Sequence, residues 1–155
     1  MGTAARVQMD GQEKRSDVAQ ILGLKGVQIE DPMTAIRITR EGLPKASISA
    51  LAQALDLPSS DMVDILPISL RTLQRYKEGR ADARLSAEVS DHMVQVSKVL
   101  AKAIEVFESA DLAKGWIKEP LPALGGQAPL SLLDTSTGVD LVMTELVRIE
   151  HGVFS

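Results

Sequence analysis

A short segment near the middle of the chain is rich in Arg, Lys and Gln. Residues 68–80, ISLRTLQRYKEGR, hold four basic residues and one acidic residue, a local charge of +3. Apolar residues recur there at three-residue steps, which predicts a helix with an inward face of Leu70, Leu73 and Tyr76. The outward face then consists of Arg71, Thr72, Gln74 and Arg75. Since Arg pairs bidentately with guanine and Gln with adenine, this face predicts contact with DNA base edges.

The residues around this helix fit the same interpretation. Ser69 precedes the helix and is a typical N-cap, while Lys77 and Arg80 lie at the far end, where they can contact phosphates. A short helix at about 59–66 and a tight turn at residues 67–68 come before it, which is a helix-turn-helix pattern. The alternative is a surface helix whose basic residues are merely solvated.

The end of the chain is a second candidate site. In VMTELVRIEHGVF, helical spacing predicts an inward stripe of Val142, Leu146 and Ile149. The residues that then leave the helix are Arg148, Glu150, His151, Val153 and Phe154. An apolar Phe154 is unusual so close to a chain end, because chain ends are normally polar. Spacing alone favours packing of this residue on its own core, and docking onto a partner is the alternative.

Composition excludes several classes of protein. With 155 residues, 45% of them hydrophobic, the chain is long enough for one packed domain or two small ones. It has no Cys and only two His, which excludes a disulfide framework, a thiolate metal site and a His-rich metal site. No apolar run approaches the roughly 18 residues that span a bilayer, and no secretory signal is visible. We therefore expect a soluble cytoplasmic protein with no membrane partner.

Catalytic arrangements are also missing. His92 lies four residues after Glu88 on the polar side of a predicted helix, where a solvated or paired role is expected. No Ser-His-Asp order with an elbow motif is present, and the Gly125-Gly126 pair lacks the spacing of a phosphate-binding loop. We expect no enzymatic activity, no cofactor and no metal. The net charge of −4 further argues against coating of nucleic acid through bulk charge.

Helices are predicted for most of the chain, because its apolar residues are mainly aliphatic and only 3% of residues are aromatic. Residues 46–79 fit three short helices, the first capped by Ser47, and residues 86–107 fit one long helix. Residues 33–44 fit either a helix or a strand. Residues 1–31 show no sustained period, so we expect a flexible arm with one short helix around residues 17–22.

The long helix carries apolar residues close to a heptad repeat. They are Val89, Met93, Val96, Leu100, Ile104 and Phe107. Such a seam is either the core of the protein itself or the surface of a homodimer, and the spacing leaves both open.

Several motifs together resemble the Xre-type antitoxins of bacterial RES–Xre toxin–antitoxin modules, also called the MbcA/ParS group. They are ISLRTLQRYKEG at 68–79, VLAKAIEVF at 99–107, Trp116 followed by PLPALGGQAPLSLLDT at 120–135, and the tail ending in RIEHGVF at 148–154. The resemblance covers residues 33–155, about four-fifths of the chain.

The resemblance implies an all-α fold in which an N-terminal Xre/Cro-like helix-turn-helix is joined by a long helix to a small helical toxin-binding domain. The expected division is a flexible arm at 1–32, a DNA-binding domain at 33–84, and a dimerisation and toxin-binding domain at 85–155. The implied partners are a RES-domain toxin that depletes NAD and the operator DNA of its own operon. The implied function is to block the active site of the toxin and to repress that operon.

Site residues follow from the same comparison. DNA binding is expected of Ser69, Arg71, Thr72, Gln74, Arg75, Lys77 and Arg80. Toxin binding is expected of Trp116, Leu124, Gly125, Gly126, Arg148, Glu150, His151, Gly152, Val153, Phe154 and Ser155. A homodimer would place two reading helices about 34 Å apart on the operator. The alternatives are a stand-alone helix-turn-helix regulator without a toxin and an adaptor that binds only protein.

Overall fold

The computed structural model describes residues 17–152, and every regular element in this range is a helix. In chain order the elements are α2 (Asp17–Ile21), α3 (Pro32–Glu41), α4 (Ala46–Ala54), the 3₁₀ helix η1 (Ser59–Asp64), α5 (Leu70–Glu78), α6 (Ala87–Phe107), α7 (Ala110–Ile117), the 3₁₀ helices η2 (Pro122–Leu124) and η3 (Pro129–Leu132), and α8 (Ser136–Glu150). The predicted all-α fold class is confirmed. Residues 33–44, which fitted a helix or a strand, lie largely in α3.

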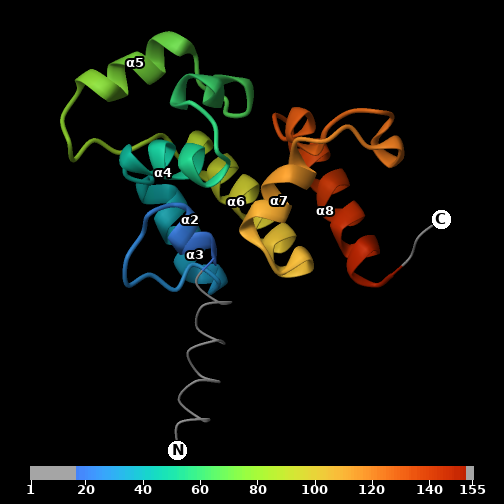
Figure 1. The fold of residues 1–155 in the computed structure, drawn as a ribbon. Helices are drawn as coiled ribbons and strands as arrows, with labels where there is room; N and C mark the ends of the chain where they lie inside the picture. The colour runs from blue at the N-terminus through green and yellow to red at the C-terminus, as the bar shows by residue number, and fades with distance from the viewer. Residues whose placement is uncertain (1–16, 153–155) are drawn as a thin grey trace, which may run out of the picture.

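The long helix α6 runs through the centre of the molecule, with α2 and α3 on one side and α7 and α8 on the other (Figure 1). It begins at Ser86, whose hydroxyl accepts a hydrogen bond from the Val89 amide at 3.2 Å. The first four residues of its apolar seam, Val89, Met93, Val96 and Leu100, are at most 5% exposed. This part of the seam is therefore internal core and not an open surface for a second copy, while Ile104 and Phe107 are half-buried.

The segment before α3 is packed, which differs from the flexible arm expected through residue 32. Val18, Ile21, Leu22 and Ile29 are buried in the same core as α6. The short helix expected around residues 17–22 is present as α2. Periodicity missed this packing because the buried residues are spread over a five-residue helix and a loop, so no single stripe repeats. The rest of the expected arm, residues 1–16, lies outside the described residues.

Ser47 shows why local signals mislead in this region. Sequence reasoning made it the N-cap of α4, but Lys45 occupies that position and makes no side-chain capping bond. Ser47 is instead buried inside the helix and donates from its hydroxyl to the Leu22 carbonyl at 2.7 Å. That bond satisfies a carbonyl at the end of α2 and ties the first segment to α4.

Two chain segments, one before α4 and one after α5, pair with each other. Residues 42–45 pair with residues 83–85, since the Leu85 amide donates to the Leu43 carbonyl at 2.8 Å and the Lys45 amide donates to the Ala83 carbonyl at 3.1 Å. Gly42 turns the chain into this pairing with φ of +91°, and an added Cβ there would overlap the Leu85 carbonyl. Only glycine accommodates this approach of two backbones.

Candidate functional site

The first candidate site is the exposed face of α5. Its N-cap prediction is confirmed, because the Ser69 hydroxyl accepts from the Thr72 amide at 3.1 Å and donates to the Thr72 hydroxyl at 2.9 Å. This pair occupies two polar groups at the start of the helix and fixes where the helix begins. Gly79 ends the helix, and its amide donates to the Arg75 carbonyl at 2.9 Å.

The inward face of α5 is narrower than the spacing predicted. Leu73 is 2% exposed and Tyr76 is half-buried, as expected, but Leu70 is 60% exposed. The prediction for Leu70 is wrong because α5 lies at the edge of the molecule and packs mainly against η1, so no element covers its first turn (Figure 1). Leu73 is therefore the one buried residue of this helix, and the half-buried Tyr76 packs against the same core.

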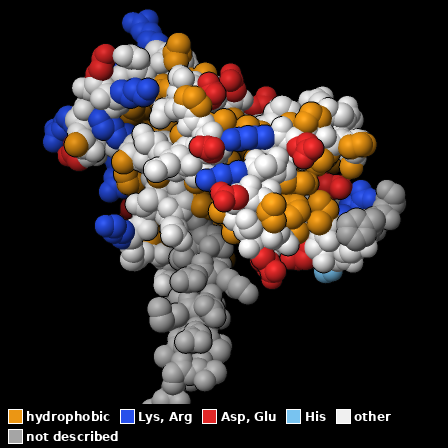
Figure 2. Space-filling model, in the orientation of Figure 1, with side chains coloured by type: hydrophobic (Ala, Val, Ile, Leu, Met, Phe, Trp, Pro, Cys, Tyr) orange, Lys and Arg blue, Asp and Glu red, His pale blue; other side chains and the backbone are white. Residues whose placement is uncertain are grey.

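The outward face carries the predicted basic residues. Arg71, Gln74, Arg75 and Lys77 are all exposed, and Lys and Arg side chains gather over the α5 region at the upper left of Figure 2. Gln74 donates to the Glu78 carboxylate at 3.2 Å. This face can offer both bidentate donors and point charges to a nucleic acid.

Two residues predicted for this surface stand apart from the others. Thr72 is half-buried, and its hydroxyl is already engaged by Ser69. Arg80 lies beyond the end of the helix and pairs with Asp82 at 3.1 Å, with both side chains more than 70% exposed. Such an exposed ion pair contributes little to stability and leaves Arg80 partly neutralised.

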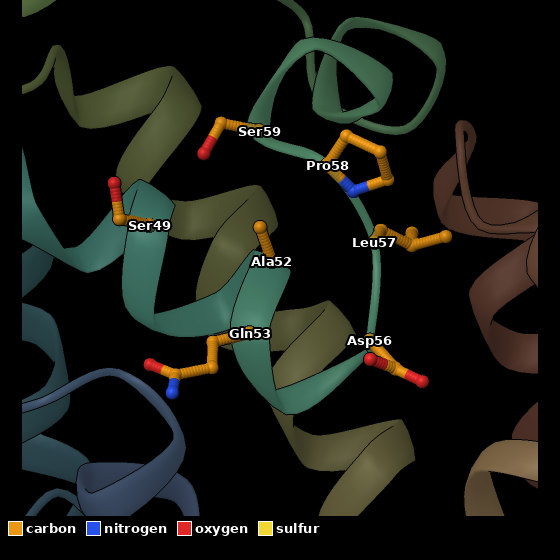
Figure 3. Close-up of a pocket in the computed structure, with 7 residues that line it drawn as sticks. All are labelled: Ser49, Ala52, Gln53, Asp56, Leu57, Pro58 and Ser59. Carbon is orange, nitrogen blue, oxygen red and sulfur yellow. The ribbon is translucent and has the colours of Figure 1, made fainter.

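An open hollow of about 490 Å³ lies between α4 and η1 (Figure 3). Ser49 and Gln53 of α4 line one side, Ser59 lines the other, and Asp56 and Leu57 come from the connection between them. The lining holds one carboxylate and no basic side chain or His that could act on a serine. In residues 17–152, no group of three or more His, Cys, Asp or Glu side chains could hold a metal ion.

The second candidate site is the loop after α7. Trp116 is half-buried, and its ring centroid lies 5.6 Å from that of Phe107 at the end of α6. Leu124 is 6% exposed, so both side chains anchor the loop. Gly125 and Gly126 are exposed, with φ of +69° and +81°, and the Gly126 amide closes the turn on the Leu121 carbonyl at 2.9 Å. The two glycines are exposed together with Pro122, Ala123 and Gln127 of the same turn.

The end of α8 is engaged within the chain. Glu150 accepts from Lys102 of α6 at 2.8 Å, and Arg148 donates to Glu145 at 3.2 Å. The hydrogen bond between Lys102 and Glu150 lowers the pKa of Glu150 and raises the pKa of Lys102 from their ordinary values. His151 is exposed, as is Gly152. Val153, Phe154 and Ser155 lie outside the described residues, so the docking expected of Phe154 is not addressed by the structure.

The sequence did not predict two exposed apolar residues on α7 and α8. Leu112 of α7 is 62% exposed and Leu141 of α8 is 49% exposed. Each lies on a helix with a clear buried stripe, and spacing identifies that stripe more readily than a second, outward apolar position. In residues 17–152, no helix is both long and apolar enough to cross a membrane.

Two family models match consecutive parts of the chain. Residues 34–98 match the antitoxin Xre-like helix-turn-helix domain, which includes α3 to α5 and most of α6. Residues 102–152 match the antitoxin Xre/MbcA/ParS C-terminal toxin-binding domain, which includes the end of α6 and all of α8. The two matches meet within the central helix.

Three curated relatives are similar over most of their length. "Antitoxin Xre" of Photorhabdus laumondii is 31% identical over 76% of this chain and 79% of its own length. "Antitoxin Xre" of Yersinia enterocolitica is 33% identical over 64% of this chain and 66% of its own length. "Prs ADP-ribosylating antitoxin" of a Sphingobium strain is 26% identical over 84% of this chain and 87% of its own length.

Proposed function

Because this chain belongs to the Xre/MbcA/ParS family of antitoxins, with a helix-turn-helix domain and a toxin-binding domain, we propose that it neutralises a RES-domain toxin and represses its own operon. The observation that carries the DNA-binding part is the exposed row of Arg71, Gln74 and Arg75 on a capped helix that packs at the edge of the molecule. The toxin-binding part rests on the family match over residues 102–152.

On the operator, α5 enters the major groove. Arg71, Gln74 and Arg75 read base edges, while Lys77 and Arg80 contact phosphates together with the Ser69–Thr72 end. The overall charge of −4 means that affinity comes from this local patch. Two copies on two half-sites about 34 Å apart would double the contacts. Such a homodimer must use a surface other than the stretch of the α6 seam from Val89 to Leu100, which is buried.

On the toxin, the exposed glycine turn at Gly125 and Gly126 and the end of the chain form the contact, and Trp116 and Leu124 hold the turn in place. Glu150 and Arg148 are paired within the chain, so the residues that follow α8 are the ones that enter the active-site opening. The antitoxin itself performs no catalysis in this scheme and acts in the cytoplasm, where both the toxin and the operator are found.

The first experiment separates the two activities. Arg71→Ala combined with Arg75→Ala should abolish the shift of operator DNA and leave toxin neutralisation intact, because α5 and α8 lie on opposite sides of α6 (Figure 1). A matched control is Lys98→Ala, which removes an exposed charge from α6. A double variant that still shifts the operator at wild-type concentrations would refute the assignment of the reading helix.

The second experiment removes only the tail. Truncation after Gly152 keeps the Lys102–Glu150 ion pair and all of α8, so operator binding should persist while growth protection against the co-expressed toxin is lost. Co-purification with the product of the adjacent gene measures the same contact directly. A truncated chain that still protects cells would remove the tail from the mechanism.

A different toxin chemistry is a second candidate, because one relative carries the words "Prs ADP-ribosylating" in its name. The toxin partner of this chain would then transfer ADP-ribose to a protein. Measurement of both cellular NAD and ADP-ribosylated protein after withdrawal of the antitoxin distinguishes the two. Loss of NAD without ADP-ribosylated protein supports the RES toxin, and ADP-ribosylated protein supports the alternative. An adjacent gene of neither kind favours a stand-alone regulator.

A further inference from the structure

The reading helix α5 is weakly packed for an element that must be precisely oriented. Leu73 is its one buried residue, and a groove of about 360 Å³ lies beside it, lined by Ile48 of α4 and by Leu73 and Tyr76 of α5. This groove shares Ser49 and Ser59 with the hollow of Figure 3. Tyr76 is only half-buried against the core, so side-chain packing supports the last turn of α5 only in part.

Lys45, at the start of α4, also lines this groove and spans it to the end of α5. Its ammonium donates to the Tyr76 carbonyl at 2.6 Å and to the Gly79 carbonyl at 2.8 Å, which are 31 and 34 residues away along the chain. Both acceptors are at the C-terminal end of α5. The last carbonyls of a helix have no partner within the helix, and the negative end of the helix dipole attracts a cation.

The base of the Lys45 side chain is itself well anchored. The Lys45 amide donates to the Ala83 carbonyl, and α4 begins at the next residue. The neighbouring residue, Pro44, forms a bridge with Arg84. The ammonium thus links the end of α5 to a point held by both α4 and the segment that follows α5.

We propose that Lys45 is a positioning residue for DNA recognition, which holds the last turn of α5 at the angle that α5 needs in the major groove and does not itself contact DNA. This inference rests on the proposed DNA-binding function. Two of the three donors of the ammonium already point at α5 carbonyls, and the side chain is half-buried. Lys77, by contrast, is exposed on the same helix and is the kind of lysine that contacts phosphate.

The distinction between positioning and phosphate contact is measurable. Each phosphate contact contributes about 0.9 to the slope of log affinity against log salt, so loss of a contact lowers that slope. Loss of a positioning residue misaligns the side chains that contact the bases, while the number of phosphate contacts stays the same. Such a loss should therefore weaken operator binding more than binding to unrelated DNA.

The test compares three variants of the full chain in titrations of operator DNA and unrelated DNA at several salt concentrations. Lys45→Met should lower operator affinity about tenfold, with unrelated DNA changed less than about twofold and the salt slope unchanged. Lys77→Met should weaken both DNAs and lower the slope by about 0.9. Lys98→Met, which removes an exposed charge on α6, should leave all three quantities at wild-type values.

A second measurement tests, without DNA, whether the two hydrogen bonds of Lys45 stabilise the end of α5. Amide hydrogen exchange at Lys77, Glu78 and Gly79 should be faster in Lys45→Met than in the wild type, because the last turn of α5 loses its external support. If Lys45→Met is too unstable for titration, Lys45→Gln keeps a neutral amide NH₂ as donor group and should show the same pattern with a smaller loss.

The outcomes separate this inference from the proposed function. If Lys45→Met binds the operator like the wild type, or if its salt slope falls as in Lys77→Met, Lys45 is not a positioning residue. If wild-type protein shows no salt-dependent preference for the operator, the proposed DNA-binding function fails. The hydrogen-exchange measurement then still decides whether Lys45 stabilises the last turn of α5. Equal exchange rates in Lys45→Met and the wild type would refute that stabilisation.

Discussion

Lys102 and Glu150 join the C-terminal part of α6 to the last residue of α8. The Lys102 ammonium is 2.8 Å from one Glu150 oxygen and 3.7 Å from Glu105 on its own helix. Their side chains are 21% and 31% exposed, which makes this the best shielded of the ion pairs in residues 17–152. The pair fixes the point from which the residues after α8 depart.

The contribution of this pair to stability should depend on pH at both ends of the range. The hydrogen bond from Lys102 lowers the pKa of Glu150 below its ordinary 4.5, so its contribution is present above pH 4.5 and is lost as the pH falls through the lowered pKa. The same hydrogen bond raises the pKa of Lys102 above its ordinary 10.5, so its contribution is lost as the pH rises through the raised pKa.

We therefore expect Glu150→Gln to have a lower free energy of unfolding than the wild type between about pH 6 and 9, and the difference should shrink below pH 4.5. Urea unfolding at a series of pH values measures this. Glu105→Gln is the matched control, because Glu105 is 60% exposed and lies farther from Lys102, so its effect should be smaller. A difference that grows as the solution becomes acidic would contradict the ion-pair explanation.

The attachment of α5 is a property of the helix as a whole. Its first turn is capped by Ser69, its last turn is held by Lys45, and its middle is attached through Leu73. Each attachment comes from a different kind of interaction: a local side-chain cap, a distant cation and apolar burial. Because few side chains of α5 pack against the rest of the protein, most of the other positions of the helix are exposed and can contact DNA.

Leu73→Ala should detach α5 and lower the free energy of unfolding by about 2–5 kcal/mol, because the buried side chain leaves a cavity. Operator affinity should fall with it. Leu70→Ala is the matched control on the same helix, since Leu70 is 60% exposed, and it should change stability by less than about 0.5 kcal/mol. Thermal unfolding of the two variants measures both values, and equal losses would refute the observed orientation of α5.

Across the molecule, the two family domains share one core. The buried residues of α2, α4, α6 and α8 form a single cluster, and α6 belongs partly to each family match. Lys118, just after α7, also donates to the Asp56 carbonyl at 3.1 Å, which ties the C-terminal part to the segment after α4. The proposed boundary between residues 84 and 85 therefore separates functions within one continuous core.

The shared core predicts a single unfolding transition. Leu51→Ala, at a fully buried position of α4, should destabilise the protein by about 2–5 kcal/mol. The fluorescence of Trp116, on the other side of α6, should report the same shifted midpoint as far-UV circular dichroism. Ser49→Ala is an exposed control on α4. A Trp116 transition that does not move with Leu51→Ala would mean that the two halves unfold separately.

Local chemistry was sufficient to predict most of the helices and much of the candidate DNA surface. The caps at Ser69 and Ser86 and the buried stripe through Val89 and Met93 follow from neighbours within one or two helical turns. The exposed arginines of α5 were predictable for the same reason. Side chains a few residues apart on a helix have a fixed relation to one another, whatever surrounds the helix.

Long-range contacts decided the rest. Whether the seam of α6 is core or dimer surface depends on α2, α3, α7 and α8, which pack against α6 from both the preceding and the following parts of the chain. The burial of Val18, the exposure of Leu70, and the bonds of Lys45 and Glu150 likewise depend on partners far away in sequence or on the absence of a covering element. A periodic pattern shows which side of a helix prefers burial, and only the packed chain determines what covers that side.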